Sequence, residues 1–135
     1  MADTRAPERP ISPHMTIYRW PVPMMMSIAH RITGAGLYFG TLLMVWWLIA
    51  TASGPNAYAQ VGAFINSVFG RLILFGYTWA LIHHMLGGIR HLIWDVGHGF
   101  EPNEREFLSL ATLIGSIGLT ILIWIFGYFV IGGPR

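Results

Sequence analysis

Long stretches without a charged side chain constrain this sequence more than any other feature. Residues 32–52 contain no Asp, Glu, Lys or Arg, and neither do residues 107–131. At about 1.5 Å of helical rise per residue, the first stretch just spans a hydrocarbon core of about 30 Å. Because lipid offers the backbone no hydrogen-bond partners, such segments favour helices. The sequence therefore predicts an all-α membrane protein with three transmembrane helices, over about residues 28–52, 70–93 and 107–131.

The segments around these predicted helices differ in composition. Five prolines fall within residues 1–23, and because proline opposes helix formation we expect an extended N-terminal arm along the membrane surface. Residues 24–135 then form a single three-helix transmembrane domain, whose first helix is expected to begin near Met24. We expect residues 56–66 to form an external connection and residues 97–105 a short charged loop.

The arginines predict the orientation in the membrane, because short loops on the inner side carry the excess of basic residues. Three spans place the N-terminus and the second loop on the same side. Six arginines fall on that side and two on the other: Arg5, Arg9, Arg19, Arg31, Arg90 and Arg105 against Arg71 and Arg135. We therefore expect the N-terminus inside. The first residues lack the basic and apolar regions of a secretory signal, so the first span is expected to direct insertion.

Composition excludes several functions. Only 10% of the residues are charged and 54% are apolar, which leaves no basic face for nucleic acid. There is no cysteine. This excludes disulfides, thiolate catalysis and an iron–sulfur cluster held by this chain alone.

Two groups of residues near the inner ends of the first two spans carry ionisable or small side chains. Ionisable residues within a membrane are costly, so they are functional candidates by default. The members of each group are spaced i, i+3, i+4, i+7 and share one helical face. The groups are Ser27, His30, Arg31 and Gly34, and His84, Gly87, Gly88 and His91. Both groups lie at the same side of the membrane, so the two faces are candidates to meet.

His84 is the candidate haem ligand. A neutral imidazole in a low-dielectric setting is a good ligand for haem iron, and Gly87 and Gly88 leave room for a flat macrocycle. Nearby cations suit the propionates; they are His30, Arg31, Arg90 and His91. Alternatively, a membrane histidine hydrogen-bonds a neighbouring helix and glycines let helices approach. His83, about 100° away on the helix, is the competing ligand, but only His84 shares a face with both glycines and His91.

Ser27 and Arg31 are candidates for binding a quinone. A quinone needs hydrogen-bond donors for its carbonyl oxygens and an apolar slot for its ring and tail, and these two side chains lie at the mouth of an apolar bundle. The alternative is that Ser27 caps the first helix and Arg31 extends to the lipid headgroups. Gly36 and Gly40 form a GxxxG pair, which is more typical of close helix packing than of a cofactor site.

These motifs together resemble a known family. The elements that carry the resemblance run in order from about residue 9 to residue 97; they are Arg9-Pro10-Ile11-Ser12-Pro13-His14, Ser27-Ile28-Ala29-His30-Arg31-Ile32-Thr33-Gly34, and His84 through Gly88-Ile89-Arg90-His91 with Asp95. They resemble the cytochrome b membrane-anchor subunit of succinate dehydrogenase. In that family two small anchor subunits bind one b-type haem between them and pass electrons from succinate oxidation to ubiquinone. The oxidation takes place on a flavoprotein subunit, and an iron–sulfur subunit carries the electrons to the membrane.

The resemblance implies a role for each candidate residue. It makes His84 the axial iron ligand, places His30, Arg31 and His91 near the haem propionates, and places Ser27, Arg31 and Trp20 in the ubiquinone pocket. The implied partners are the second anchor subunit with the other axial histidine, the iron–sulfur subunit, the flavoprotein with the dicarboxylate site, and the lipid bilayer. The implied location is a bacterial inner membrane or the mitochondrial inner membrane. The alternatives are the anchor of a fumarate reductase and a structural or transport subunit without a cofactor.

Overall fold

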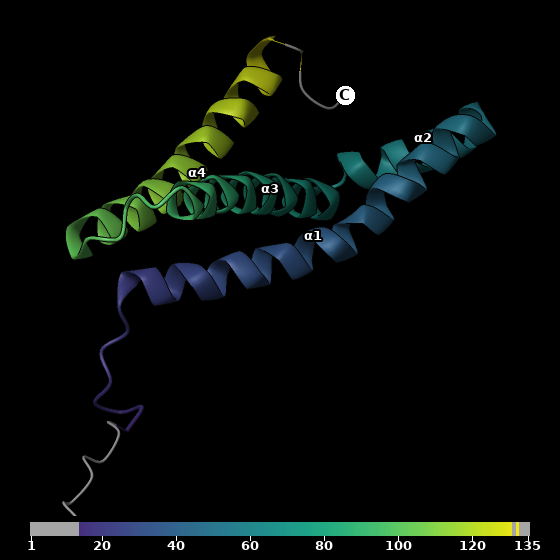
Figure 1. The fold of residues 1–135 in the computed structure, drawn as a ribbon. Helices are drawn as coiled ribbons and strands as arrows, with labels where there is room; N and C mark the ends of the chain where they lie inside the picture. Colours follow the sequence, from purple (N-terminus) through teal and green to yellow (C-terminus); the bar gives the residue numbers. More distant parts are fainter. Residues whose placement is uncertain (1–13, 131, 133–135) are drawn as a thin grey trace, which may run out of the picture.

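A computed structural model describes residues 14–130 and residue 132. Within that part of the chain there are four α-helices and no strand (Figure 1). The helices are α1 (Val22–Ser53), α2 (Pro55–Asn66), α3 (Val68–Asp95) and α4 (Pro102–Val130). Helices α1, α3 and α4 are long and apolar enough to cross a membrane, so the all-α fold with three transmembrane helices is confirmed.

The spanning helices are longer than the uncharged stretches alone indicate. Helix α1 begins at Val22, where Pro21 occupies the N-cap and Pro23 the first turn, a position that tolerates proline because no intrahelical N–H bond is lost there. It ends at Ser53, and Gly54 follows as its C-cap with a φ of 108°, which favours glycine. Helix α4 begins at Pro102, and its first turn carries Glu104. These helices therefore extend beyond the uncharged stretches, so that α1 includes Arg31 and the first turn of α4 includes Glu104.

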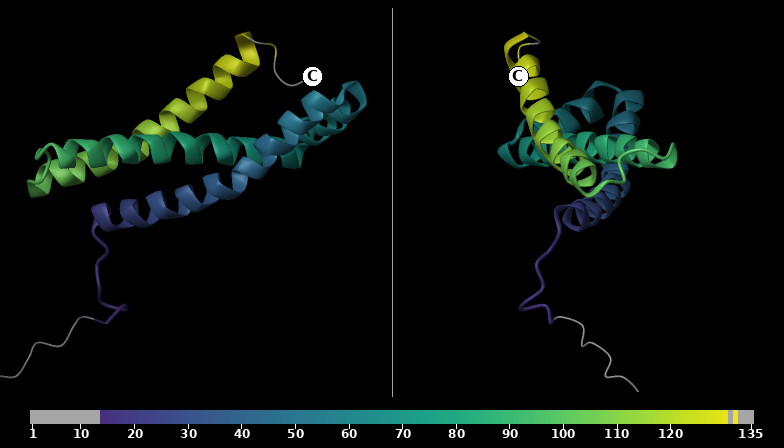
Figure 2. Two further views of the ribbon diagram at one scale, coloured as in Figure 1. Left: turned by 45° about the vertical axis from the view of Figure 1, so that its right-hand side comes forward. Right: turned by 60° about the vertical axis from the view of Figure 1, so that its left-hand side comes forward.

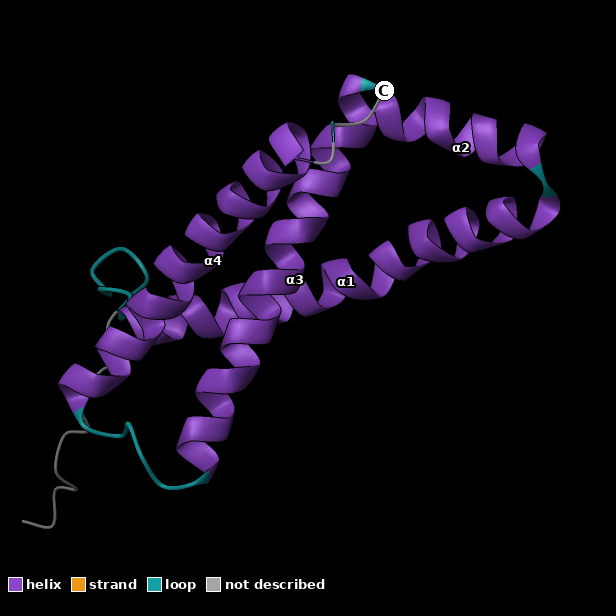
Figure 3. Cartoon of the chain, turned by 90° about the horizontal axis from the view of Figure 1, so that it is seen from above, coloured by secondary structure: helices purple, strands orange, loops and turns teal. Residues whose placement is uncertain are grey.

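The connection predicted between the first two spans is itself helical. Helix α2 begins with Pro55 in its first turn, and it is rich in alanine, the residue with the highest helix propensity. Val61 is its buried residue, and α2 packs against both α1 and α3. Ser67 then caps α3, since its Oγ accepts a hydrogen bond from the backbone N–H of Gly70 at 3.0 Å. Figure 3 shows α2 joining the end of α1 to the start of α3.

Helix α3 lies at the centre of the bundle and packs against both α1 and α4. The start of α1, the end of α3 and the start of α4 lie at one end of the bundle, and α2 lies at the opposite end (Figures 1 and 2). Toward its C-terminus α4 diverges from α3 (Figure 1). The end that holds the start of α1 corresponds to the predicted inner side. The orientation itself stays a prediction, and the arm up to residue 13 lies outside the described residues.

The faces of the spanning helices explain why the chain belongs in a membrane. Most of their large apolar side chains are exposed; they include Leu42, Trp46, Trp47, Leu81, Ile114, Leu122 and Phe126. In contrast, the buried face of α4 consists of small hydroxyl side chains: Ser109, Thr112, Ser116 and Thr120. Small residues let helix backbones approach closely in lipid. The apolar surface therefore faces lipid or partner helices, while the polar groups pack inside.

Candidate functional site

The two predicted polar faces meet between α1 and α3. The imidazole of His30 on α1 stacks on that of His84 on α3, with ring centroids 3.9 Å apart and an interplanar angle of 3°. The ring centroid of His91, two turns further along α3, lies 5.4 Å from that of His30. The structure thus brings three of the predicted residues together at the predicted inner end of the bundle. We refer to His30, His84 and His91 as the histidine cluster.

Glycines make this approach possible, one on each helix. A Cβ added to Gly34 of α1 would lie 2.9 Å from Cε1 of His84, and one added to Gly87 of α3 would collide with the ring of His30. Gly88, by contrast, has nothing within 4 Å of its added Cβ. Close helix packing, the alternative for these glycines, is thus observed at Gly87, whereas Gly88 faces open space.

The hydrogen bond of His84 determines which of its ring nitrogens is left to bind a metal. Its Nδ1 lies 3.1 Å from the backbone carbonyl oxygen of His30. A carbonyl oxygen only accepts hydrogen bonds, so Nδ1 carries the proton and donates it, which leaves the Nε2 lone pair available. Metal-ligating histidines are commonly oriented in this way, with one ring nitrogen donating to a carbonyl. The chemistry of this donor set fits an axial ligand of haem iron.

His83, the competing ligand, has a different environment. It is 1% exposed, and its Nδ1 lies 3.2 Å from Oγ of Ser116 on α4. Its ring centroid lies 5.2 Å from that of Trp79. Each of the two histidines thus forms a hydrogen bond with a neighbouring helix, His83 with α4 and His84 with α1. His84 alone of the two faces the histidine cluster.

Arg90 also faces α4 rather than the histidine cluster. It is 2% exposed, its Nη1 donates a hydrogen bond of 3.4 Å to Oγ of Ser109, and its guanidinium carbon lies 5.1 Å from the ring centroid of Trp94. The sequence grouped Arg90 with the cations for the propionates, because its position along α3 is right. Its angular position around α3, however, places it on the face that packs against α4.

The three residues predicted to bind the quinone lie at the same end of the bundle but in different surroundings. Ser27 is half-buried and Arg31 exposed on α1, in the same turns as His30. Trp20 precedes α1 and makes an edge-to-face contact with Tyr18, with ring centroids 6.1 Å apart. Trp20 lines a surface cavity of about 580 Å³ with the start of α4, including Arg105, and neither Ser27 nor Arg31 lines that cavity. The described residues therefore place all three at one end of the bundle, and of the three only Trp20 lines this cavity.

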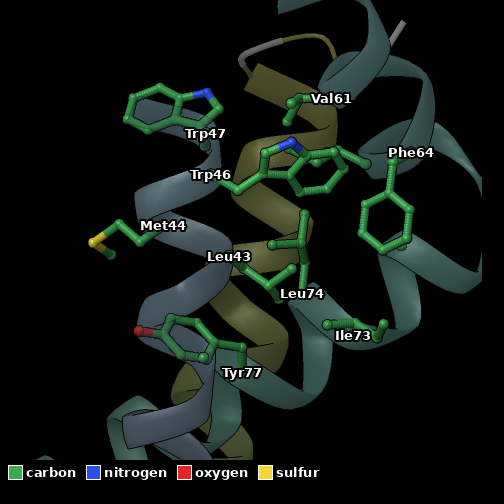
Figure 4. Close-up of a pocket in the computed structure, with 12 residues that line it drawn as sticks. Leu43, Met44, Trp46, Trp47, Val61, Phe64, Ile73, Leu74 and Tyr77 are labelled. Atoms are coloured by element: carbon green, nitrogen blue, oxygen red, sulfur yellow. The ribbon is translucent and has the colours of Figure 1, made fainter. Parts of the chain in front are cut away.

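A second, strongly apolar cavity of about 240 Å³ lies among α1, α2 and α3, and Figure 4 shows it. Trp46 and Trp47 from α1, Phe64 from α2 and Tyr77 from α3 contribute to its walls. It belongs to the half of the bundle that contains α2, away from the histidine cluster. The sequence did not predict it, since residues 56–66 were expected only to form an external connection. Its lining carries no histidine or charged residue that links it to the chemistry of the cluster.

Fold and site together define a small multi-pass membrane protein with a histidine cluster between its first two spanning helices. The chain belongs to the family described as succinate dehydrogenase/fumarate reductase transmembrane subunit, which it matches over residues 5–131.

Curated relatives cover most of the chain. It is 42% identical over 122 residues to the succinate dehydrogenase cytochrome b556 subunit of Paracoccus denitrificans, covering 90% of this chain and 94% of that one. It is 37% identical over 118 residues to the cytochrome b556 subunit of Rickettsia prowazekii, covering 87% and 92%. The mitochondrial cytochrome b560 subunit of Sus scrofa is 36% identical over 122 residues, covering 84% and 71%.

Proposed function

We propose that this chain is a membrane-anchor subunit of succinate dehydrogenase that binds a b-type haem with a second anchor subunit and forms part of the ubiquinone-reduction site. The relatives are named as cytochrome b subunits of succinate dehydrogenase, which supports a haem. The observation that carries the proposal is the hydrogen bond from Nδ1 of His84 to the carbonyl of His30. It holds the ring in the tautomer whose Nε2 binds iron.

Haem, when bound, accepts and releases single electrons, and residues of this chain hold and orient it. His84 would supply one axial ligand. His30, Arg31 and His91 would lie near the propionates, where cationic or hydrogen-bonding groups favour carboxylates. Among the described residues no group of three or more His, Cys, Asp or Glu is arranged to hold a bare metal ion. The second axial histidine would come from the other anchor subunit, as the resemblance to the cytochrome b anchors implies.

Ser27 and Arg31 would donate hydrogen bonds to a quinone, with Trp20 at the edge of the pocket. The two donors lie four residues apart on one face of α1, and His30 lies between them in sequence. Residues of the second anchor subunit and of the iron–sulfur subunit would complete the quinone pocket, as the resemblance to the cytochrome b anchors implies. The soluble iron–sulfur subunit, with the flavoprotein behind it, would dock at the end of the bundle that holds the histidine cluster.

The proposed location is a bacterial inner membrane or the mitochondrial inner membrane, because the relatives come from bacteria and from mitochondria. The second candidate is the anchor of a fumarate reductase, since the family description includes both enzymes. The relatives quoted above are all named as succinate dehydrogenase subunits, which favours the first. The direction of turnover with the quinone of the host membrane separates them.

The decisive experiment is an optical and electron paramagnetic resonance (EPR) spectrum of the complex isolated through a tag on this chain. The expected result is a low-spin b-type haem that is lost in His84→Ala. His98→Ala is the matched control, because His98 is exposed in the loop after α3, and its haem is expected to remain. An unchanged haem spectrum in His84→Ala would refute the ligand assignment.

A further inference from the structure

Helix α3 presents two polar faces to two different helices. His84 and His91 face α1, whereas His83 and Arg90 face α4 and are 1% and 2% exposed. Within each pair the residues are seven positions apart, which keeps them on one face of the helix. The two faces are offset by about 100° because the pairs differ by one position.

Helix α4 supplies one hydroxyl for each member of the second pair. Ser116 Oγ lies 3.2 Å from His83 Nδ1, and Ser109 Oγ lies 3.4 Å from Arg90 Nη1. Both serines are completely buried. The pairs share one antiparallel register, since seven positions forward along α3 match seven positions back along α4. A single orientation of the two helices therefore satisfies both contacts.

The direction of these hydrogen bonds follows from the serine protons. Ser116 Oγ donates to the carbonyl of Leu113 at 2.8 Å, and Ser109 Oγ donates to the carbonyl of Arg105 at 2.7 Å. Each serine oxygen is thus left as an acceptor for α3. It follows that Nδ1 of His83 carries the proton. No water in the hydrocarbon core replaces these bonds once the helices turn away from each other.

Because His83 and His84 are adjacent, a small rotation of α3 decides which of them faces His30, and the contacts with α4 fix that rotation. Turning α3 by one residue about its axis would move His83, or in the opposite sense Met85, into the place of His84 beside His30. It would also remove both hydrogen bonds to α4 and leave buried polar groups unsatisfied. We propose that the α3–α4 seam, formed by His83 with Ser116 and Arg90 with Ser109, sets the rotation of α3 and so aims His84 at α1. His83 and Ser116 are then positioning residues, and their bearing on the haem rests on the proposed function.

Cross-linking measures this rotation without a cofactor, because the chain has no cysteine of its own. The on-face pair is Gly34→Cys with His84→Cys, since a Cβ at position 34 lies against the ring of His84. The off-face pair is Gly34→Cys with Met85→Cys, because Met85 is exposed, and it is made in a His84→Ala background so that neither pair holds a ring against position 34. Disulfide yields are compared in membranes that contain all subunits of the complex. The ratio of on-face to off-face yield reports where α3 points.

Ser116→Ala is expected to lower this ratio by roughly threefold or more, the factor that one hydrogen bond between membrane helices typically contributes. Ser116→Thr keeps the hydroxyl and is expected to restore it. Thr112→Val is the matched control, since Thr112 is buried on the same face of α4 and donates to Leu108 within its own helix. A ratio in Ser116→Ala equal to that in Thr112→Val would overturn the proposal.

The haem provides a second readout in the otherwise unaltered complex. Ser116→Ala is expected to shift the g-value of the low-spin EPR signal, which depends on the orientation of the axial ligands, while succinate oxidation with an artificial acceptor persists. An unshifted signal would contradict a role in aiming the ligand. If the unaltered complex carried no haem, the proposed function would fail, whereas the cross-linking ratio would still decide whether the seam sets the rotation of α3.

Discussion

His30 on α1 and His84 on α3 lie face to face, with ring centroids 3.9 Å apart and planes only 3° from parallel. Each ring packs against a glycine of the opposite helix: His84 against Gly34, and His30 against Gly87. The contact is therefore reciprocal, and it fixes how closely the two helices approach. The hydrogen bond from His84 to the carbonyl of His30 adds a polar contact at the same place.

Gly87→Ala is expected to disturb this stack. The added Cβ would collide with the His30 ring, and overpacking of this kind costs about 1–3 kcal/mol, which exceeds the ~1 kcal/mol that alanine gains over glycine in a helix. The expected result is lower haem content per flavin and a shifted haem spectrum in the purified complex.

Gly76→Ala is the matched control on the same helix, because nothing lies within 4 Å of its added Cβ. Its haem content is expected to match the unaltered protein. Equal haem loss in both variants would mean that glycine at position 87 serves helix flexibility and not the approach of His30.

The contact between the His30 face of α1 and the His84 face of α3 was predictable from the sequence for a simple geometric reason. Residues spaced i, i+3, i+4, i+7 share a helical face wherever the helix lies, so the groups around His30 and His84 were identifiable before any tertiary structure. The partner of His83 was not predictable in this way. It depends on how α4 is aligned along α3, and nothing in the local sequence around His83 specifies Ser116. The same reason explains why the contact between Arg90 and Ser109 on α4 was not predictable.

Helix α2 was missed for a different reason. Residues 56–66 were interpreted as a connection because they are weakly polar and too short to span a membrane. The segment is nevertheless helical, since Pro55 suits a first turn and Val61 becomes buried against the neighbouring helices. Charge counting identifies segments that cross lipid, but it does not separate an irregular loop from a short helix.

Ser27→Ala is expected to slow ubiquinone reduction while succinate oxidation by an artificial acceptor persists. The loss of one hydrogen bond to the quinone is worth about 1–1.5 kcal/mol, which corresponds to roughly a fivefold to tenfold lower kcat/KM for quinone. Ser53→Ala, at the other end of α1, is the control, since Ser53 is exposed and donates to Ile49 within its own helix. Equal loss of both activities in Ser27→Ala would indicate failed assembly instead of a quinone contact.

Arg31→Leu is expected to affect both the quinone and the haem. Quinone reduction should fall as in Ser27→Ala. The haem midpoint potential should also fall, because a nearby cation stabilises the reduced haem, which carries one more electron. An interaction on the order of 1 kcal/mol at this exposed position corresponds to about 40 mV for one electron. Redox titration measures the shift, and Arg19→Leu, an exposed arginine before α1, should leave the potential unchanged. An unaltered potential in Arg31→Leu would remove Arg31 from the neighbourhood of the propionates.

Ser67→Ala tests the junction between α2 and α3, far from the histidine cluster. Ser67 Oγ accepts from the N–H of Gly70 at 3.0 Å and donates to the carbonyl of Phe64 at 2.6 Å, so one side chain caps α3 and ties it to the end of α2. Loss of a serine N-cap costs about 1 kcal/mol, and heat inactivation should be faster by up to about fivefold. The haem spectrum at low temperature should be unchanged, because the cap lies at the opposite end of α3 from His84. Loss of heat stability no greater than in Ser53→Ala would show that the α2–α3 junction holds without its cap.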